Sequence, residues 1–94
     1  MSCGWFVFTC INCCRAHLID YSTLIEVAKE HNLEVNRELE NFKGYEIVIK
    51  CPKDDNNYSS ETYRPDQLRF VIGDQSDRLF YEVIEKNNIY IKKV

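Results

Sequence analysis

The stretch of residues 5–31, WFVFTCINCCRAHLIDYSTLIEVAKEH, holds the strongest structural signals in the sequence. It opens with residues 5–11, an apolar run rich in aromatic and β-branched side chains, which is typical of a strand covered on both faces. Asp20 is a favourable N-cap residue, and apolar side chains recur after it at helical spacing. We therefore predict a central strand followed by a helix that begins near Asp20.

The helix has two possible ends. Asn32 tolerates the left-handed conformation and would end it, with Leu33 folding back onto the last turn. The second possibility continues the helix to Phe42 and ends it at Gly44, but it aligns four glutamates at four-residue spacing, where like charges repel. We favour the end at Asn32, after which residues 33–39 alternate as a strand.

Short segments that alternate apolar and polar residues fill the rest of the chain. This alternation predicts strands at residues 45–51, 68–72, 79–83 and 89–94. A polar loop spans residues 53–66, and Asn87-Asn88 fits a hairpin turn. The predicted fold class is α+β in the order β-α-β-β-β-β-β, a single domain over residues 1–94. Its one helix packs on a five- or six-stranded, mainly antiparallel sheet.

The composition sets limits on function. The chain has 94 residues, of which 45% are hydrophobic and 29% charged, and its net charge is −3. These values exclude a disordered chain and argue against a protein built to grip nucleic acid, which needs a basic surplus. Few alanines and glycines beside many Asn, Ile and Lys residues indicate an AT-rich genome, as in a virus or mobile element.

Five cysteines are present, and four of them lie within the first fourteen residues. An odd number cannot all pair within one chain. No secretory signal or membrane-spanning stretch is recognisable, so we expect a cytoplasmic protein with reduced thiols.

The run Cys10-x-x-Cys13-Cys14-x-x-His17 is the clearest chemical motif. Thiolate sulfur and imidazole nitrogen are ligands that Zn²⁺ prefers, so Cys10, Cys13, Cys14 and His17 are candidate metal ligands, with Cys3 as a further one. The same spacing suits thiol redox chemistry. Two more interpretations are a disulfide that joins Cys51 to Cys3 or Cys13, and thiols that are simply small buried hydrophobes.

Partner contact is the second candidate role. Tyr58 and Tyr63 in the polar loop, with Arg64 beside them, are candidate contact residues. Residues 89–94 would form an edge strand able to pair across a two-fold axis, giving a homodimer. No nucleotide-binding or hydrolase motif is recognisable. We therefore expect a small non-enzymatic binding or regulatory protein with no cofactor, acting through an unidentified protein partner. The competing hypothesis is a zinc-binding or thiol-redox protein.

Overall fold

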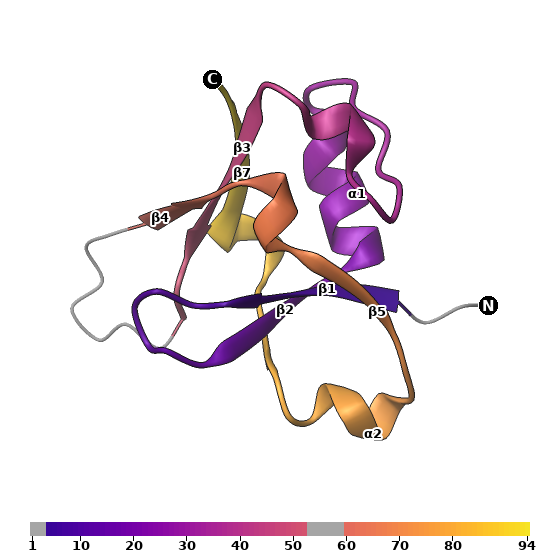
Figure 1. Ribbon diagram of the computed structural model, residues 1–94, viewed down its shortest axis with the longest axis vertical. Coiled ribbons are helices and arrows are strands. Elements are labelled where there is room, and N and C mark those ends of the chain that lie inside the picture. Colours follow the sequence, from indigo (N-terminus) through magenta and orange to yellow (C-terminus); the bar gives the residue numbers. More distant parts are fainter. Residues whose placement is uncertain (1–3, 53–59) are drawn as a thin grey trace.

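The computed structural model describes residues 4–52 and 60–94 (Figure 1). The strands are β1 Gly4–Thr9, β2 Ala16–Asp20, β3 Tyr45–Lys50, β4 Ser60–Tyr63, β5 Arg69–Ile72, β6 Glu82–Val83 and β7 Ile89–Lys93. The α-helices are α1 Tyr21–Lys29 and the single turn α2 Gln75–Arg78. Three short 3₁₀ turns complete the elements: Glu40–Phe42, Pro65–Gln67 and Lys86–Asn88.

The strands form two sheets, here called sheet A and sheet B. Sheet A has the order β5-β1-β2-β6, and sheet B has the order β4-β3-β7. Strands β2 and β6 are parallel, whereas the other pairs in the described part of the chain are antiparallel. The predicted α+β class is confirmed. Among the residues that the structure describes, the strands number seven and divide between two sheets, where we predicted five or six strands in one sheet.

Helix α1 begins and ends where the sequence predicts. Asp20 occupies the N-cap position, but its carboxylate caps no backbone N–H. Instead it forms an ion pair with Arg78, whose Nη2 lies 3.1 Å from Asp20 Oδ2. At the C-terminal end of the helix, Asn32 adopts a left-handed φ of 56°, and the Leu33 N–H donates to the Ala28 carbonyl at 3.1 Å. This hydrogen bond supplies a donor to a backbone carbonyl that the end of the helix leaves without an intrahelical partner.

The predicted strand over residues 33–39 is absent from the structure. Leu39 has a φ of 54°, which is incompatible with a strand, and a 3₁₀ turn follows it. Side chains take over the backbone hydrogen bonding of this segment: Asn36 Oδ1 accepts the Glu40 N–H at 2.9 Å, and Asn41 donates to the Glu34 carbonyl at 3.2 Å. Asparagine often competes with regular structure in this way.

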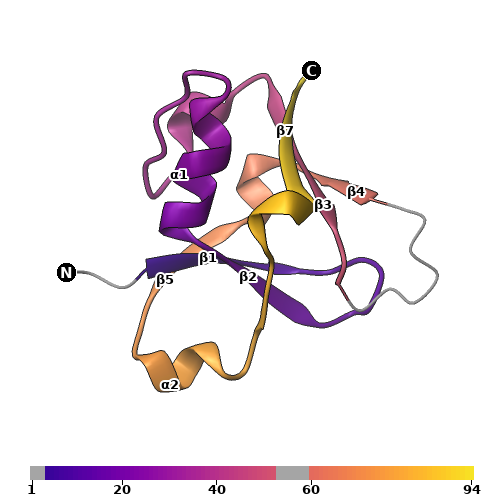
Figure 2. The same cartoon turned by 180° about the vertical axis from the view of Figure 1, so that it is seen from behind.

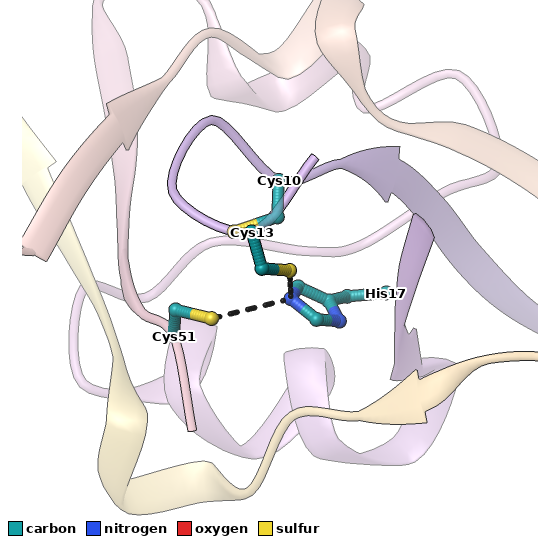
Figure 3. Close-up of side chains that lie close together, drawn as sticks. All are labelled: Cys10, Cys13, His17 and Cys51. Atoms are coloured by element: carbon teal, nitrogen blue, oxygen red, sulfur yellow. Dashed lines mark hydrogen bonds between the residues drawn. The ribbon is translucent and has the colours of Figure 1, made fainter. Parts of the chain in front are cut away.

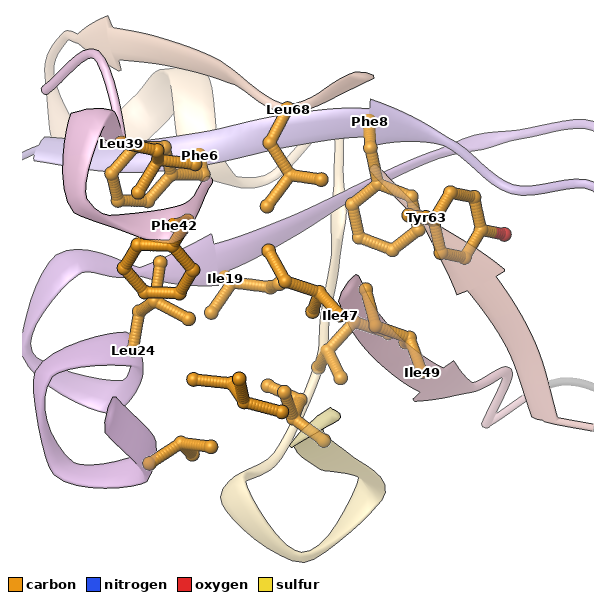
Figure 4. Packing of buried hydrophobic residues seen from close by; sticks show 14 of the residues in the cluster. Phe6, Phe8, Ile19, Leu24, Leu39, Phe42, Ile47, Ile49, Tyr63 and Leu68 are labelled. Carbon is orange, nitrogen blue, oxygen red and sulfur yellow. The ribbon is translucent and has the colours of Figure 1, made fainter. Parts of the chain in front are cut away.

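The main core lies between sheet A, helix α1 and sheet B (Figures 1, 2 and 4). Alternate residues of β1 and β2 face it, because successive side chains of a strand point to opposite faces. The buried side chains shown in Figure 4 include Phe6, Phe8, Ile19, Leu24, Leu39, Phe42, Ile47, Ile49, Tyr63 and Leu68. The same core extends to Cys10 and Cys51, and so reaches the chemical motif.

The opposite face of sheet A is covered by α2 and the segments beside it (Figure 1). Trp5 is fully buried there, and the Arg78 guanidinium lies 5.6 Å from its ring centroid. Our prediction of a strand over residues 79–83 followed by a hairpin at Asn87-Asn88 is wrong. Only Glu82–Val83 is a strand, and it pairs with β2, whereas β7 pairs with β3 of sheet B.

Strand β1 is central, between β5 and β2, as its apolar run indicates. Strand β2 was not expected, because Leu18 and Ile19 are adjacent in Ala16–Asp20 and the segment shows no regular alternation of apolar and polar residues. No helix within residues 4–52 and 60–94 is long and apolar enough to cross a membrane.

Candidate metal centre

A tight loop between β1 and β2 presents the Cys-x-x-Cys pair. The Cys10 N–H donates to the Arg15 carbonyl at 2.8 Å, and the Cys14 N–H donates to the Cys10 carbonyl at 3.0 Å. Cys14 has a left-handed φ of 60°, which turns the chain back toward β2. Backbone hydrogen bonds within the loop therefore help to hold Cys10 and Cys13 in place.

Four side chains converge beside this loop (Figure 3). We call them the Cys/His cluster: Cys10, Cys13, His17 and Cys51. Their sulfur atoms and an imidazole nitrogen all lie within 4.8 Å of one another. His17 Nε2 lies 3.2 Å from Cys13 Sγ and 3.5 Å from Cys51 Sγ. Cys10, His17 and Cys51 are buried and Cys13 is half-buried, so the cluster is largely shielded from water.

These separations are close to the edges of a tetrahedral zinc site. Zn–S bonds of about 2.3 Å and Zn–N bonds of about 2.1 Å place two sulfurs about 3.8 Å apart and sulfur about 3.6 Å from nitrogen. The two distances to His17 Nε2, 3.5 Å and 3.2 Å, are shorter than the sulfur–nitrogen edge by about 0.1 Å and about 0.4 Å. No two ligand atoms are farther apart than 4.8 Å, which is about 1 Å longer than the sulfur–sulfur edge. Small side-chain rotations would therefore bring the four atoms onto one ion.

The ligand set comes from both sheets. Cys10 and Cys13 lie in the β1–β2 loop and His17 lies in β2, all belonging to the hairpin of sheet A. Cys51 directly follows β3 of sheet B. A metal bound here would join the two sheets directly. Along the chain, its ligands His17 and Cys51 are 34 residues apart.

The surroundings of Cys10 favour a thiolate. Burial raises the pKa of Cys10, but hydrogen bonds to its sulfur lower that pKa by more. They come from the backbone N–H groups of Cys13 and Asn12 and from the thiols of Cys51 and Cys13. The net result is a pKa below the ordinary value. Backbone N–H donors directed at a sulfur stabilise its charged form. The charged form is also the one that binds a metal.

The structure brings together three of the four metal ligands that we predicted and replaces the fourth. Cys14 is exposed and lies outside the Cys/His cluster, because its left-handed backbone turns its side chain away from that of Cys13. Cys51 takes its place. The sequence carries a signal for it, since Cys51 ends the inward face that begins with Ile47 and Ile49. Cys3 lies outside the described residues.

The predicted contact residues do not form an exposed group. Tyr63 is only 1% exposed, and its ring packs against Phe8 with centroids 4.8 Å apart. Its position in β4 explains this correction, since it is inward-facing rather than part of a polar loop. Arg64 is exposed and pairs with Asp66 at 3.3 Å. Tyr58 lies outside the described residues.

Tyr63 instead reaches the β1–β2 loop that carries Cys10 and Cys13. Its hydroxyl accepts the Ile11 N–H at 3.1 Å. Burial, together with the neighbouring Cys10, raises the pKa of Tyr63 to about 12, although the Ile11 N–H lowers it.

The disulfide predicted as a possibility for Cys13 and Cys51 is not realised, since both are thiols in the structure, as are Cys10 and Cys14. The thiol of Cys13 is engaged with His17 Nε2 instead. In comparisons with known proteins, no family model, curated protein or solved structure matches this chain significantly.

Proposed function

We propose that this protein binds one Zn²⁺ ion through its Cys/His cluster and uses it as a structural centre. The observation that carries the proposal is the convergence of four ligand atoms within 4.8 Å from two separate sheets. Three thiolates and one imidazole form a ligand set found in structural zinc sites, and soft sulfur donors select zinc over Mg²⁺ or Ca²⁺.

The number of ligands supports a structural role. Catalytic zinc sites keep one of four positions open for water or substrate, whereas structural sites fill all four with protein atoms. Here four protein ligands are available, and three of them are buried. A four-coordinate ion in this cluster has no position left for a reacting water, which favours a non-enzymatic protein.

The location of the cluster explains what the ion would do. A 94-residue chain buries a limited fraction of its surface, and small domains commonly gain stability from a metal. Zinc bound by Cys51 and by the hairpin ligands would tie sheet B to sheet A. Since the ligands converge only in the folded chain, the free energy of binding contributes directly to folding.

Native mass spectrometry tests this proposal on full-length protein purified without added metal or chelator. We expect a mass excess of one zinc per chain that EDTA removes. Cys51→Ser would lose the zinc, whereas the matched control Cys14→Ser would keep it. A metal-free wild-type chain after incubation with Zn²⁺, or equal zinc contents in the two variants, would refute the proposal.

Protein contact is a second candidate function, and the exposure of two adjacent side chains favours it. Leu79 and Phe80 are 85% and 83% exposed. With Arg15 and Glu82 they line a cavity of about 380 Å³ beside the edge strand β6. Large exposed apolar side chains gathered at one place commonly mark an interaction site.

We assign a second copy of this chain as the partner. Two apolar side chains alone make a small patch, but a two-fold axis brings the same patch from both copies and doubles the apolar area. Sedimentation velocity of the wild type and of the Leu79→Ser/Phe80→Ser double variant tests this assignment. We expect a wild-type dimer and a monomeric variant; a wild type that stays monomeric at high concentration would refute it.

A further inference from the structure

The side chain of Tyr63 extends from sheet B to the loop that carries Cys10 and Cys13. The side chain is buried, and its ring packs against Phe8 at a centroid distance of 4.8 Å. Its hydroxyl ends beside the loop and accepts the Ile11 N–H at 3.1 Å. A buried polar group held at both its ring and its oxygen has little freedom to move.

The hydrogen-bonding capacity of this hydroxyl is only partly used by Ile11. A tyrosine hydroxyl accepts through its lone pairs and donates one hydrogen, which it retains at neutral pH. The Ile11 N–H occupies an acceptor site and leaves the hydrogen to be donated elsewhere. Cys10 directly precedes Ile11 in the same loop, and its side chain lies close enough to raise the pKa of Tyr63. The Cys10 sulfur is therefore the acceptor that the geometry offers for this hydrogen.

We propose that Tyr63 is a positioning residue for the zinc centre, whose hydroxyl donates to the Cys10 thiolate while it accepts the Ile11 N–H. This inference rests on the proposed zinc-binding function. Two effects follow from the geometry. The donated hydrogen bond orients the Cys10 sulfur toward the remaining ligands, and it disperses part of the negative charge that three thiolates bring to one Zn²⁺ ion.

The same contact couples the metal site to sheet B by a second route. Cys51 joins the cluster from the end of β3, and Tyr63 joins it from β4, which pairs with β3 at Ile47↔Tyr63. Groups that hydrogen-bond to a metal ligand commonly change metal affinity by about 10-fold or more when removed. Tyr63 is therefore expected to influence zinc binding without touching the ion.

Competition for Zn²⁺ against a chromophoric chelator tests the proposal on the full-length Tyr63→Phe variant, which keeps the ring and removes only the hydroxyl. The matched control is Tyr21→Phe, because the Tyr21 hydroxyl, at the start of α1, donates a 2.6 Å hydrogen bond to the Val35 carbonyl. We expect Tyr63→Phe to bind Zn²⁺ about 10-fold more weakly and Tyr21→Phe to match the wild type.

Cobalt substitution supplies a readout that loss of packing alone would not change. Co²⁺ bound by thiolates has a sulfur-to-metal charge-transfer band, whose energy falls when a hydrogen bond to the sulfur is removed. We expect this band to move to longer wavelength in Tyr63→Phe and not in Tyr21→Phe, with tetrahedral d–d bands in both.

The outcomes separate the two proposals. A wild type that binds neither Zn²⁺ nor Co²⁺ refutes the zinc-binding function itself. A wild type that binds both, with unchanged affinity and spectrum in Tyr63→Phe, overturns only the role of Tyr63. Equal weakening in both tyrosine variants without a spectral shift likewise assigns Tyr63 to general packing and overturns the inference.

Discussion

Cys51 is the most informative position to perturb, because it is the ligand that sheet B contributes to the Cys/His cluster. In the Cys51→Ser variant the remaining three ligands are present, but all of them lie on one hairpin. Three ligands on one hairpin no longer hold the zinc, and the tie between the two sheets is lost with it. The variant thus removes the link between the sheets while leaving the other three ligand side chains unchanged.

The expected loss of stability follows from the coupling of zinc binding to folding. Cys51 lies 34 residues from His17, so unfolding separates it from the hairpin ligands and releases the ion. A ligand that binds only the folded chain stabilises it by about 4 kcal/mol when its free concentration is about 1,000 times its dissociation constant. For a domain of this size each 1 kcal/mol changes the melting temperature by about 4–8 °C. Cys51→Ser should therefore melt about 15–30 °C below the wild type when zinc is present.

Thermal unfolding followed by circular dichroism, with Zn²⁺ in excess and again with EDTA, measures this loss. Cys14→Ser is the matched control, since Cys14 is exposed and lies outside the cluster. In EDTA the three proteins should melt within a few degrees of one another, because none of them then holds the cross-link. A Cys51→Ser deficit of equal size with and without zinc would show that Cys51 acts through packing, and the reasoning would fail.

Three further predictions concern the thiols, the core and one turn. In the zinc-loaded protein iodoacetamide should modify Cys14, whereas the three cluster cysteines should react only after chelation, as peptide mass mapping would show. Leu24→Ala should lower the free energy of unfolding by about 3–4 kcal/mol in denaturant titrations, since Leu24 is fully buried; a cost below about 1 kcal/mol would contradict the core assignment. Gly44→Ala should cost about 1–2 kcal/mol because Gly44 has a φ of +84°, and no atom lies within 4 Å of an added Cβ, so the cost is one of backbone conformation alone. An unchanged midpoint for Gly44→Ala would contradict that left-handed conformation.

Two features of the fold were predictable from short stretches of sequence: strand β1 and the C-terminal end of helix α1. The apolar run of β1 indicates a covered strand, and the left-handed Asn32 followed by Leu33 predicts the end of α1. Both depend on the nearest few residues. The predicted strand over residues 33–39 fails because alternation of apolar residues also suits an irregular segment whose side chains pack inward, and asparagine side chains satisfy the backbone there.

Strand pairing lies beyond the reach of these patterns. Glu82–Val83 has too few residues to carry an alternation signal, and its partner is β2, more than sixty residues earlier in the chain. Residues 79–81 have an apolar character that predicts burial, yet Leu79 and Phe80 are exposed. An apolar pattern shows only the type of each side chain. Whether that side chain is buried depends on whether another element packs over it once the sheets have formed.

The candidate metal site divides in the same way. The sequence by itself determined three of its members, since Cys10, Cys13 and His17 are neighbours along the chain and their spacing alone suggests ligation. Only the tertiary structure decided that Cys14 turns outward, that Cys51 completes the set, and that Tyr63 belongs beside the cluster rather than on the surface. The reason is physical: residue spacing does not give the backbone torsion angles that direct a loop side chain, and a ligand from the end of β3 arrives only when two sheets pack on a shared core.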